Sequence, residues 1–396
     1  MTILYQITLW GGISIQETSV DNVISGNEIH DNDGAGISFS DASDNNVLTG
    51  NDIINNIGVG ISISGSSSTV IGGSDASESN YISGNSVGIS VNNWGASSSE
   101  NTRIQGNVIT NSVAGGIIVQ FGPTNTLIGG TNINEGNIIN NNGLGGVIVA
   151  QTTISALPIT LTPNRIAILG NTILDNIATM PNSGLGIDLG GFIDDSMPPD
   201  GNPEVINDFG PTPNDASDAD TGANGYINFP VLSTATQNGS SLSVALDLDA
   251  ADSPSNEYRV EFFANDTADS SEHGEGQTFL GATTLSPGSG QTATITLPSG
   301  TDLTGKVLSA TTTAIDASTN SGFGSTSEFS AVVTPQVLSA STTTPTQNTA
   351  TTQNQANLGQ TGQKVRTTAL LTVFVLSSLA AAIVARRKYV YTLNRG

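Results

Sequence analysis

The sequence predicts an all-β fold: a repetitive parallel β-solenoid, then an antiparallel β-sandwich, then a single C-terminal transmembrane helix. Three observations carry this prediction: a recurring Gly-Asn motif in the first half, longer alternating stretches in the second, and an uncharged apolar run near the end. The 36% hydrophobic fraction and the 11% charged fraction exclude a disordered chain and a coiled coil. The absence of Cys excludes disulfides, thiolate zinc sites and cysteine nucleophiles.

The first half repeats a short motif with the pattern Asn-x-Ile-x-Gly-Asn-x-Ile. Its copies are Asn22–Ile29, Asn46–Ile53, Asn80–Val87 and Thr102–Ile109. A second unit with the pattern Gly-Ile-x-Ile follows each copy, and a third unit appears as Thr69–Gly73 and Thr126–Gly130. Short β-branched strands broken by Gly-Asn corners have no helical period, and both corner residues tolerate positive φ. Each repeat therefore predicts one coil of a parallel β-solenoid, with stacked Asn side chains at the corners.

This repeat resembles the right-handed parallel β-helix repeat proteins, a family with pectate-lyase-like folds. It also resembles bacterial surface proteins whose coils end in Gly-Ile-Asp-Leu-Gly, here Gly186–Gly190, before an Asp-rich loop and a β-domain. The resemblance implies a right-handed β-helix over residues 1–190. Residues 1–10 lack the features of a signal peptide, and Gly11–Ile15 already matches a repeat strand, so we expect an N-terminally incomplete helix.

Residues 191–224 form an Asp/Pro/Gly-rich connecting loop, and residues 225–333 carry signals of longer strands. Seven strands separated by Gly, Pro, Asn and Asp turns predict an Ig-like β-sandwich without the Cys pair or core Trp. The expected strands are Tyr226–Leu232, Leu242–Leu248, Tyr258–Phe262, Gln277–Leu285, Thr292–Leu297, Lys306–Ile315 and Ser327–Val333.

The C-terminal region predicts a membrane anchor. Residues 334–366 are rich in Thr, Ser and Gln, which predicts an extended stalk. Residues 367–385 carry no charge over a length that spans the hydrocarbon core as a helix. The basic tail at 386–396 is expected to stay cytoplasmic, which places the rest of the chain outside the cell.

Leu358-Gly359-Gln360-Thr361-Gly362 stands before the apolar run. It resembles the Leu-Pro-x-Thr-Gly cell-wall sorting signal, with Leu358, Thr361 and Gly362 matching and Gly359 replacing Pro. The resemblance implies cleavage between Thr361 and Gly362 and attachment to the cell wall. If this motif is not processed, the helix is the permanent anchor, and both outcomes place the protein on the cell surface.

The distribution of charge excludes nucleic acid as a partner. All 34 acidic residues precede Gly362, against four basic residues in the same stretch, which gives 4 − 34 = −30. We expect no catalytic residues and no organic cofactor, because no nucleotide-binding or nucleophile motif is present. We expect the other residues that could carry catalysis or bind a metal to be solvated or structural instead. They are Arg103 and Arg165, the Asp194–Asp195 pair, His30 and His273.

One metal site is predicted in the connecting loop. Asp215, Asp218 and Asp220 lie within six residues of one another before Gly222, in the oxygen-rich setting that calcium prefers. The spacing departs from that of the EF-hand, and a solvated acidic linker is the alternative interpretation.

The leading functional hypothesis is a surface-anchored, non-catalytic protein for adhesion or for interaction with glycans of the cell envelope. The expected partners are glycans or another cell surface, together with the membrane through residues 367–385. The alternatives are a surface-anchored polysaccharide lyase or glycoside hydrolase with active residues on further N-terminal coils, and a passive structural spacer.

Overall fold

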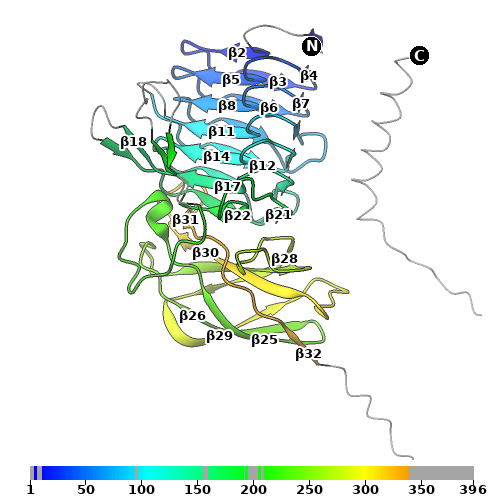
Figure 1. The fold of residues 1–396 in the computed structure, drawn as a ribbon, viewed down its shortest axis with the longest axis vertical. Coiled ribbons are helices and arrows are strands. Elements are labelled where there is room, and N and C mark those ends of the chain that lie inside the picture. The colour runs from blue at the N-terminus through cyan, green and yellow to red at the C-terminus, as the bar shows by residue number, and fades with distance from the viewer. Residues whose placement is uncertain are drawn as a thin grey trace, which may run out of the picture. The chain divides into compact units, whose positions relative to one another are not determined.

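The computed structural model describes residues 4–6, 11–93, 97–154, 159–190, 192–194, 204–206 and 209–338. These residues belong to one compact unit in which a β-helix is followed by a two-sheet domain (Figure 1). Within these ranges, no helix has both the length and the apolar character needed to cross a bilayer. The predicted transmembrane segment 367–385, the basic tail 386–396 and the motif of Leu358, Thr361 and Gly362 lie outside the described residues.

The predicted parallel β-helix is confirmed, with three sheets that stack one strand per coil. Sheet A contains, in order, β1 (Leu4–Gln6), β4 (Glu28–His30), β7 (Asp52–Ile54), β10 (Tyr81–Ser83), β13 (Val108–Thr110), β16 (Ile138–Asn140) and β21 (Thr172–Leu174). Sheet B contains β2 (Ile13–Ile15), β5 (Ile37–Ser40), β8 (Ile61–Ser64), β11 (Ile89–Asn92), β14 (Ile117–Gln120), β17 (Gly145–Ala150) and β22 (Leu185–Asp188). Sheet C contains β3 (Val23–Ser25), β6 (Val47–Thr49), β9 (Val70–Gly72), β12 (Arg103–Gln105), β15 (Leu127–Gly129) and β20 (Ala167–Leu169).

The interior of the β-helix is a stack of aliphatic side chains in exact register. In sheet A, one inward residue per coil lies directly above the next and is at most 1% exposed. These residues are Ile29, Ile53, Ile82, Ile109, Ile139 and Ile173. Because each coil repeats the same inward position, identical β-branched side chains stack along sheet A from one coil to the next.

The predicted Asn stacks form buried ladders at the corners. At the corner between sheets C and A, the Oδ1 atom of each Asn accepts both the backbone N–H and the side-chain N–H of the Asn one coil earlier, at 2.9–3.2 Å. The members are Asn27, Asn51, Asn80, Asn107, Asn137 and Asn171. Their steps of 24, 29, 27, 30 and 34 residues are the true coil lengths.

The predicted alignment of one repeat was wrong. Asn80–Val87 was aligned with Asn46–Ile53 through Gly84 and Gly50, but Asn80 continues the ladder after Asn51. Asn85, next to Gly84, belongs to a second ladder at the corner between sheets A and B. Both corners use Asn after a short strand, so the motif alone does not distinguish them. The unit Thr69–Gly73 is in fact the sheet C strand of that coil.

The second part of the described chain contains two four-stranded sheets. One holds β29 (Gly288–Thr296), β26 (Ser241–Leu248), β25 (Val231–Asn238) and β32 (Gln336–Leu338), in that order. The other holds β28 (Thr278–Leu285), β27 (Tyr258–Asn265), β30 (Val307–Ile315) and β31 (Phe323–Thr326). Buried residues of both sheets, including Val244, Leu246, Tyr258 and Phe262, belong to one hydrophobic cluster. We call this region the sandwich.

Three expected boundaries in the sandwich were wrong. Tyr226 ends a short 3₁₀ helix, η1 (Ala223–Tyr226), and the first strand begins only at Val231. The last expected strand, Ser327–Val333, forms only isolated bridges, at Ala331 and Val333, because the edge of that sheet is occupied by β31. β32 lies in the stretch assigned to the stalk, and its Val337 packs against the core.

The sandwich closes the last coil of the β-helix with side chains that replace a further coil. Glu275 ends the second Asn ladder: its Oε1 accepts both the backbone N–H (3.1 Å) and the side-chain N–H (3.3 Å) of Asn176, as an Asn of the next coil would. Glu261 accepts the N–H of Gly170 at 2.8 Å. Backbone donors at the end of a sheet are thus paired rather than left open to association.

The same closure occurs at two further positions. The Asn224 side chain exchanges hydrogen bonds with the backbone of Ile166, at 2.8 and 2.9 Å. Glu328 accepts the N–H of Leu189 at 2.8 Å. Gly186 lies against the ring of Phe329, and a Cβ atom there would come within 2.9 Å of that ring, so only glycine permits this approach. The Gly-Ile-Asp-Leu-Gly segment is therefore the surface on which the sandwich packs.

Candidate metal-binding loop and adjoining cavity

The three predicted calcium ligands converge in the structure. One carboxylate oxygen from each of Asp215, Asp218 and Asp220 lies within 4.8 Å of the others. Asp218 is buried, and the other two are half-buried. Three carboxylate oxygens at this separation can share one hard cation, and the remaining ligands of calcium would be carbonyl oxygens or water.

Backbone hydrogen bonds fix the orientation of Asp218. Its Oδ1 accepts the N–H of Asn228 at 2.9 Å, and its Oδ2 accepts the N–H of Ala251 at 2.8 Å. Ser217 and Asp218 have φ values of 65° and 49°, which bend the loop so that the carboxylate points inward. The backbone cost of these left-handed residues is offset by the buried hydrogen bonds.

Side-chain hydrogen bonds of Asn214 and Asn228 hold the loop against the segment that leads into β25. Asn228 accepts the N–H of Asp215 at 3.1 Å and donates to its carbonyl at 2.9 Å. Asn214 makes the equivalent pair with the backbone of Phe229. The Asp215 carboxylate accepts the N–H of Ala219 at 3.1 Å with each oxygen. The cluster is therefore built on a fixed backbone and not on a freely moving linker.

The electrostatics of the loop favour a bound cation. Burial raises the pKa of Asp218 and that of Asp220, and the neighbouring carboxylates raise both further. One oxygen of Asp220, Oδ1, is buried and has no hydrogen-bond partner among the described residues. Repulsion between acids and an unpaired buried acceptor are both relieved when a cation binds.

Asp220 also lines a cavity of about 670 Å³ between the β-helix and the sandwich. Among the described residues, its walls carry hydroxyl, amide, guanidinium and carboxylate groups and no aromatic side chain. The polar residues are Gln151, Thr160, Thr162, Asn164, Arg165, Asp220, Thr221, Asp252, Asp316 and Ser325. Asp252 also lines this cavity, and partial desolvation by the surrounding residues, together with the charges of Asp218 and Asp220, raises its pKa to about 6.

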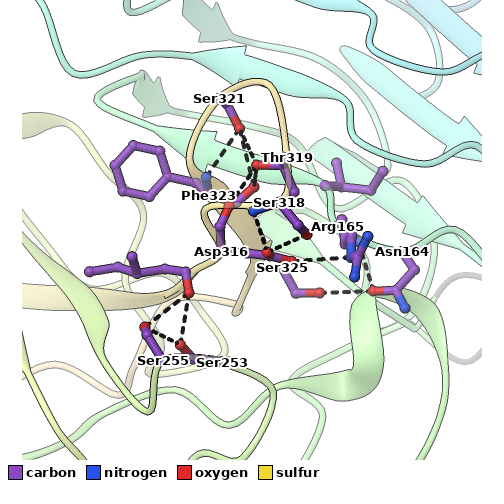
Figure 2. A network of polar contacts seen from close by, with 12 residues as sticks. Asn164, Arg165, Ser253, Ser255, Asp316, Ser318, Thr319, Ser321, Phe323 and Ser325 are labelled. Atoms are coloured by element: carbon purple, nitrogen blue, oxygen red, sulfur yellow. Dashed lines mark hydrogen bonds and ion pairs between the residues drawn. The ribbon is translucent and has the colours of Figure 1, made fainter.

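Arg165 is not simply solvated, as the sequence suggested, because its Nε lies 3.3 Å from Oδ2 of Asp316 (Figure 2). Oδ1 of Asp316 accepts hydrogen bonds from the backbone and the hydroxyl of Ser318. Ser325 donates to the side chain of Asn164 at 3.1 Å. This network joins the wall of the β-helix to the sandwich at one side of the cavity.

The remaining candidates lie apart from the cluster. Arg103 is exposed on β12. His30 contacts Asp31 at 2.8 Å on the surface. His273 is half-buried rather than solvated: its Nδ1 lies 2.8 Å from the carbonyl of Phe329, and its ring packs edge-on against Phe229. The backbone of Asp194 belongs to β23 (Phe192–Asp194), which pairs with β24 (Glu204–Ile206), and Asp195 lies outside the described residues.

Two acids at the junction of the β-helix and the sandwich were not predicted from the sequence. Asp252 lies more than thirty positions after the loop and reaches it only through the fold. Glu328 is fully buried near Asp188, and burial followed by the charge of Asp188 raises its pKa to about 8. Their neighbours in the sequence, Ala251 and Phe329, gave no sign of a site, because polar groups brought together by distant strands share no local spacing.

The comparisons with known proteins identify the fold of the first half. Residues 7–133 match the family model described as the right handed beta helix region. No curated protein matches the chain. The repeat pattern, the three parallel sheets and this match agree on one fold, while the match covers the β-helix only.

Similar solved structures include the periplasmic alginate epimerase AlgG, at 20% identity and a TM-score of 0.30 over 41% of this chain and 37% of that one. The A-module of the mannuronan C-5 epimerase AlgE6 from Azotobacter vinelandii has 19% identity and a TM-score of 0.27, over 48% of this chain and 52% of that one. Tailspike protein 2 of the Escherichia coli O157:H7 bacteriophage CAB120 has 11% identity and a TM-score of 0.25, over 81% and 50%. The chain thus spans about half or less of each of these proteins. The first half of this chain is a right-handed parallel β-helix repeat.

Proposed function

We propose that this protein is a cell-surface, non-catalytic glycan-binding protein in which a calcium ion at Asp215, Asp218 and Asp220 serves the adjoining cavity. The observation that carries the proposal is the double role of Asp220, which belongs to the carboxylate cluster and to the cavity wall. Hydroxyl, amide and carboxylate groups are the partners that sugar hydroxyls require. A cation at the wall adds a ligand position for a pair of neighbouring hydroxyls.

The calcium part of the proposal is tested by thermal unfolding. At a calcium concentration about one hundred times the Kd, binding to the folded state stabilises the protein by roughly 2.7 kcal/mol. We expect the melting temperature to rise with calcium in the wild type and to rise less in the Asp218→Asn variant. Asp302→Asn, on an exposed loop of the sandwich, is the control. A melting temperature that does not respond to calcium would remove the site.

The glycan part is tested by binding to a glycan array with calcium and with a chelator. We expect retention of a defined set of glycans in calcium and a loss of that retention in the chelator. Retention of no glycan under either condition would leave the passive spacer as the better description. Glycan binding that is unchanged by the chelator would show that glycan recognition does not require the metal.

Hydrolysis is the second candidate function, because Asp252 and Asp220 line the same cavity and both have raised pKa values. A carboxyl group with a raised pKa near a second carboxyl group is the arrangement of a glycoside hydrolase. We favour binding, because the Asp220 carboxylate belongs to the metal cluster. New reducing ends, or unsaturated ends detected by absorbance at 235 nm, would favour an enzyme.

The surface location is proposed from the sequence of residues 334–396. In this proposal the Ig-like sandwich and the stalk hold the β-helix away from the membrane, and the segment 367–385 or the sorting-like motif anchors it. Mass spectrometry of the mature C-terminus distinguishes the two anchors. A chain that ends at Thr361 and is bound to peptidoglycan indicates sorting, whereas an intact C-terminus in the membrane fraction indicates a permanent helix. A protein found only in the cytoplasm would contradict both.

A further inference from the structure

A second hollow, of about 210 Å³, lies where the outer face of sheet C meets the sandwich segment that follows β30. Its lining residues come from three successive coils and from the sandwich. They are Ser68, Val70, Asn101, Arg103, Asn125, Leu127, Asn320 and Ser321. We call it the Arg103 groove. The metal cluster and the larger cavity share none of these residues.

Arg103 stands out among the cations of the described residues. Arg165 pairs with Asp316, Arg259 pairs with Glu261, and Lys306 pairs with Asp266. Within the ranges that the structure describes, Arg103 alone among the Arg and Lys residues has no carboxylate partner. In a chain with 34 acidic and 10 basic residues, a guanidinium that finds no acid is available to an anion from outside.

The fold positions Arg103 between two apolar neighbours. β12 pairs in parallel with β9 and β15, so Val70 and Leu127 lie in register on either side of Arg103. Leu127 is covered, since Phe323 of the sandwich packs on its cluster, whereas Val70 is half-buried. Val70 beside the guanidinium of Arg103 can pack against the apolar C–H face of a sugar ring, while the guanidinium binds a polar group at the edge of the ring.

The corner residues supply the polar wall of the groove. Ser68, Asn101 and Asn125 precede the sheet C strands of successive coils and have φ values of 57°, 58° and 56°. Oδ1 of Asn125 is buried and has no hydrogen-bond partner among the described residues. A buried acceptor without a donor is costly, and turning the Asn125 amide toward the groove would let a ligand hydroxyl donate to it and recover that cost.

The sandwich supplies the opposite wall. Asn320 and Ser321 lie in the turn between Asp316 and Phe323, which Figure 2 shows as a loop held by hydrogen bonds of Thr319 and Ser321 to the backbone of Phe323. Because the Arg165–Asp316 pair fixes the base of this turn to the β-helix, the groove is bounded on both sides.

We propose that the Arg103 groove binds the carboxylate of an acidic sugar unit, with the guanidinium as its charged partner. A planar guanidinium binds a carboxylate through two parallel hydrogen bonds. The large net negative charge of the body disfavours a dense polyanion such as a nucleic acid. A uronate sugar brings one charge per ring and hydroxyls for Asn125 and Asn101. The ligand class rests on the proposed glycan binding, while the site is separate from the calcium cluster.

The test is isothermal titration of the full chain with trimers of galacturonate, glucuronate and mannuronate, each measured separately in a chelating buffer. The chelator removes the calcium-dependent contribution, so this measurement reports on the groove alone. We expect at least one trimer to bind, the methyl ester of that trimer to bind at least tenfold more weakly, and the affinity to fall with added salt.

The variants locate the binding. We expect Arg103→Gln to weaken binding at least tenfold and Arg103→Lys to weaken it less, because lysine keeps the charge but loses the paired donors. Asn320→Trp, on the opposite wall, is expected to block the groove without removing a charge. Lys306→Gln removes the same charge elsewhere and is expected to leave the affinity unchanged. Unfolding curves check that each variant is folded.

Two results would overturn the inference. One is equal binding by the wild type and Arg103→Gln, and the other is the absence of binding by all three trimers in the chelator. If neutral glycans still bind in calcium, the proposed function stands while the Arg103 groove fails. If a uronate trimer binds in the chelator but calcium-dependent retention is absent, the groove stands without the calcium-dependent part of the proposed function.

Discussion

The β-helix and the sandwich satisfy their buried polar groups in different ways. Inside the β-helix, neutral amides such as Asn80 and Asn107 both donate and accept. Each Asn therefore accepts from the Asn one coil earlier and donates to the Asn one coil later. In the sandwich, Glu261 and Glu328 are fully buried acids that accept backbone donors of the last coil. A repeating ladder needs groups without net charge, whereas the end of a ladder needs only an acceptor. The difference shows how a solenoid can be extended by amides and closed by carboxylates.

The largest effect is expected from Asn107→Ala in the middle of the ladder. The substitution leaves two buried donors of Asn80 unpaired, its backbone N–H and one side-chain N–H, and removes one donor each from Oδ1 of Asn137 and the carbonyl of Ile71. With about 1–3 kcal/mol for each buried unpaired group, we expect a loss of roughly 4 kcal/mol or more in chemical unfolding. The matched control is Asn22→Ala, whose half-buried side chain donates to Asn46 at the corner that precedes sheet C, with an expected loss of about 1 kcal/mol. Equal losses would contradict a cooperative ladder.

The next effect concerns the pH dependence of Glu328. Its folded-state pKa of about 8 lies above the ordinary 4.5, so the neutral form is favoured by folding. The resulting stabilisation is present below pH 4.5 and is lost as the pH rises toward about 8, by about 1.4 kcal/mol for each pKa unit. We expect the unfolding free energy of Glu328→Gln to fall less than that of the wild type between pH 5 and 8. Parallel profiles for the two proteins would contradict the assignment.

A smaller effect is expected at the last rung, where Glu275 accepts two donors of Asn176. Glu275→Ala removes Oε1, which accepts both donors of Asn176, and Oε2, which accepts the N–H of Asp175, from a half-buried position, with an expected loss of about 2 kcal/mol. Glu275→Gln keeps a carbonyl oxygen and is expected to lose less than 1 kcal/mol. The two unfolding free energies, measured near pH 7, decide whether the acceptor or the charge closes the ladder. A larger loss for the Gln variant would favour the charge.

Much of the fold could be predicted from the sequence because the β-helix depends on local periodicity. The inward Ile positions and the Asn corners repeat along the chain. Asp215, Asp218 and Asp220 are close in sequence, so their spacing was enough to predict that the three carboxylates lie together. The register at Asn80 could not be read, since two corners use the same residues. Asp252 and the closing acids could not be predicted either, because strands remote in sequence place them.

The central claim is that Asp220 links a cation to glycan binding without cleavage. Its most direct test is equilibrium dialysis, in calcium, of the glycan best retained on the array, with the wild type and the near-isosteric Asp220→Asn variant. Mass spectrometry of the recovered glycan is part of the same measurement. We expect the wild type to bind the glycan and to return it intact, and the variant to bind at least tenfold more weakly. Equal binding by the two proteins, or a shortened glycan recovered from the wild type, would contradict it.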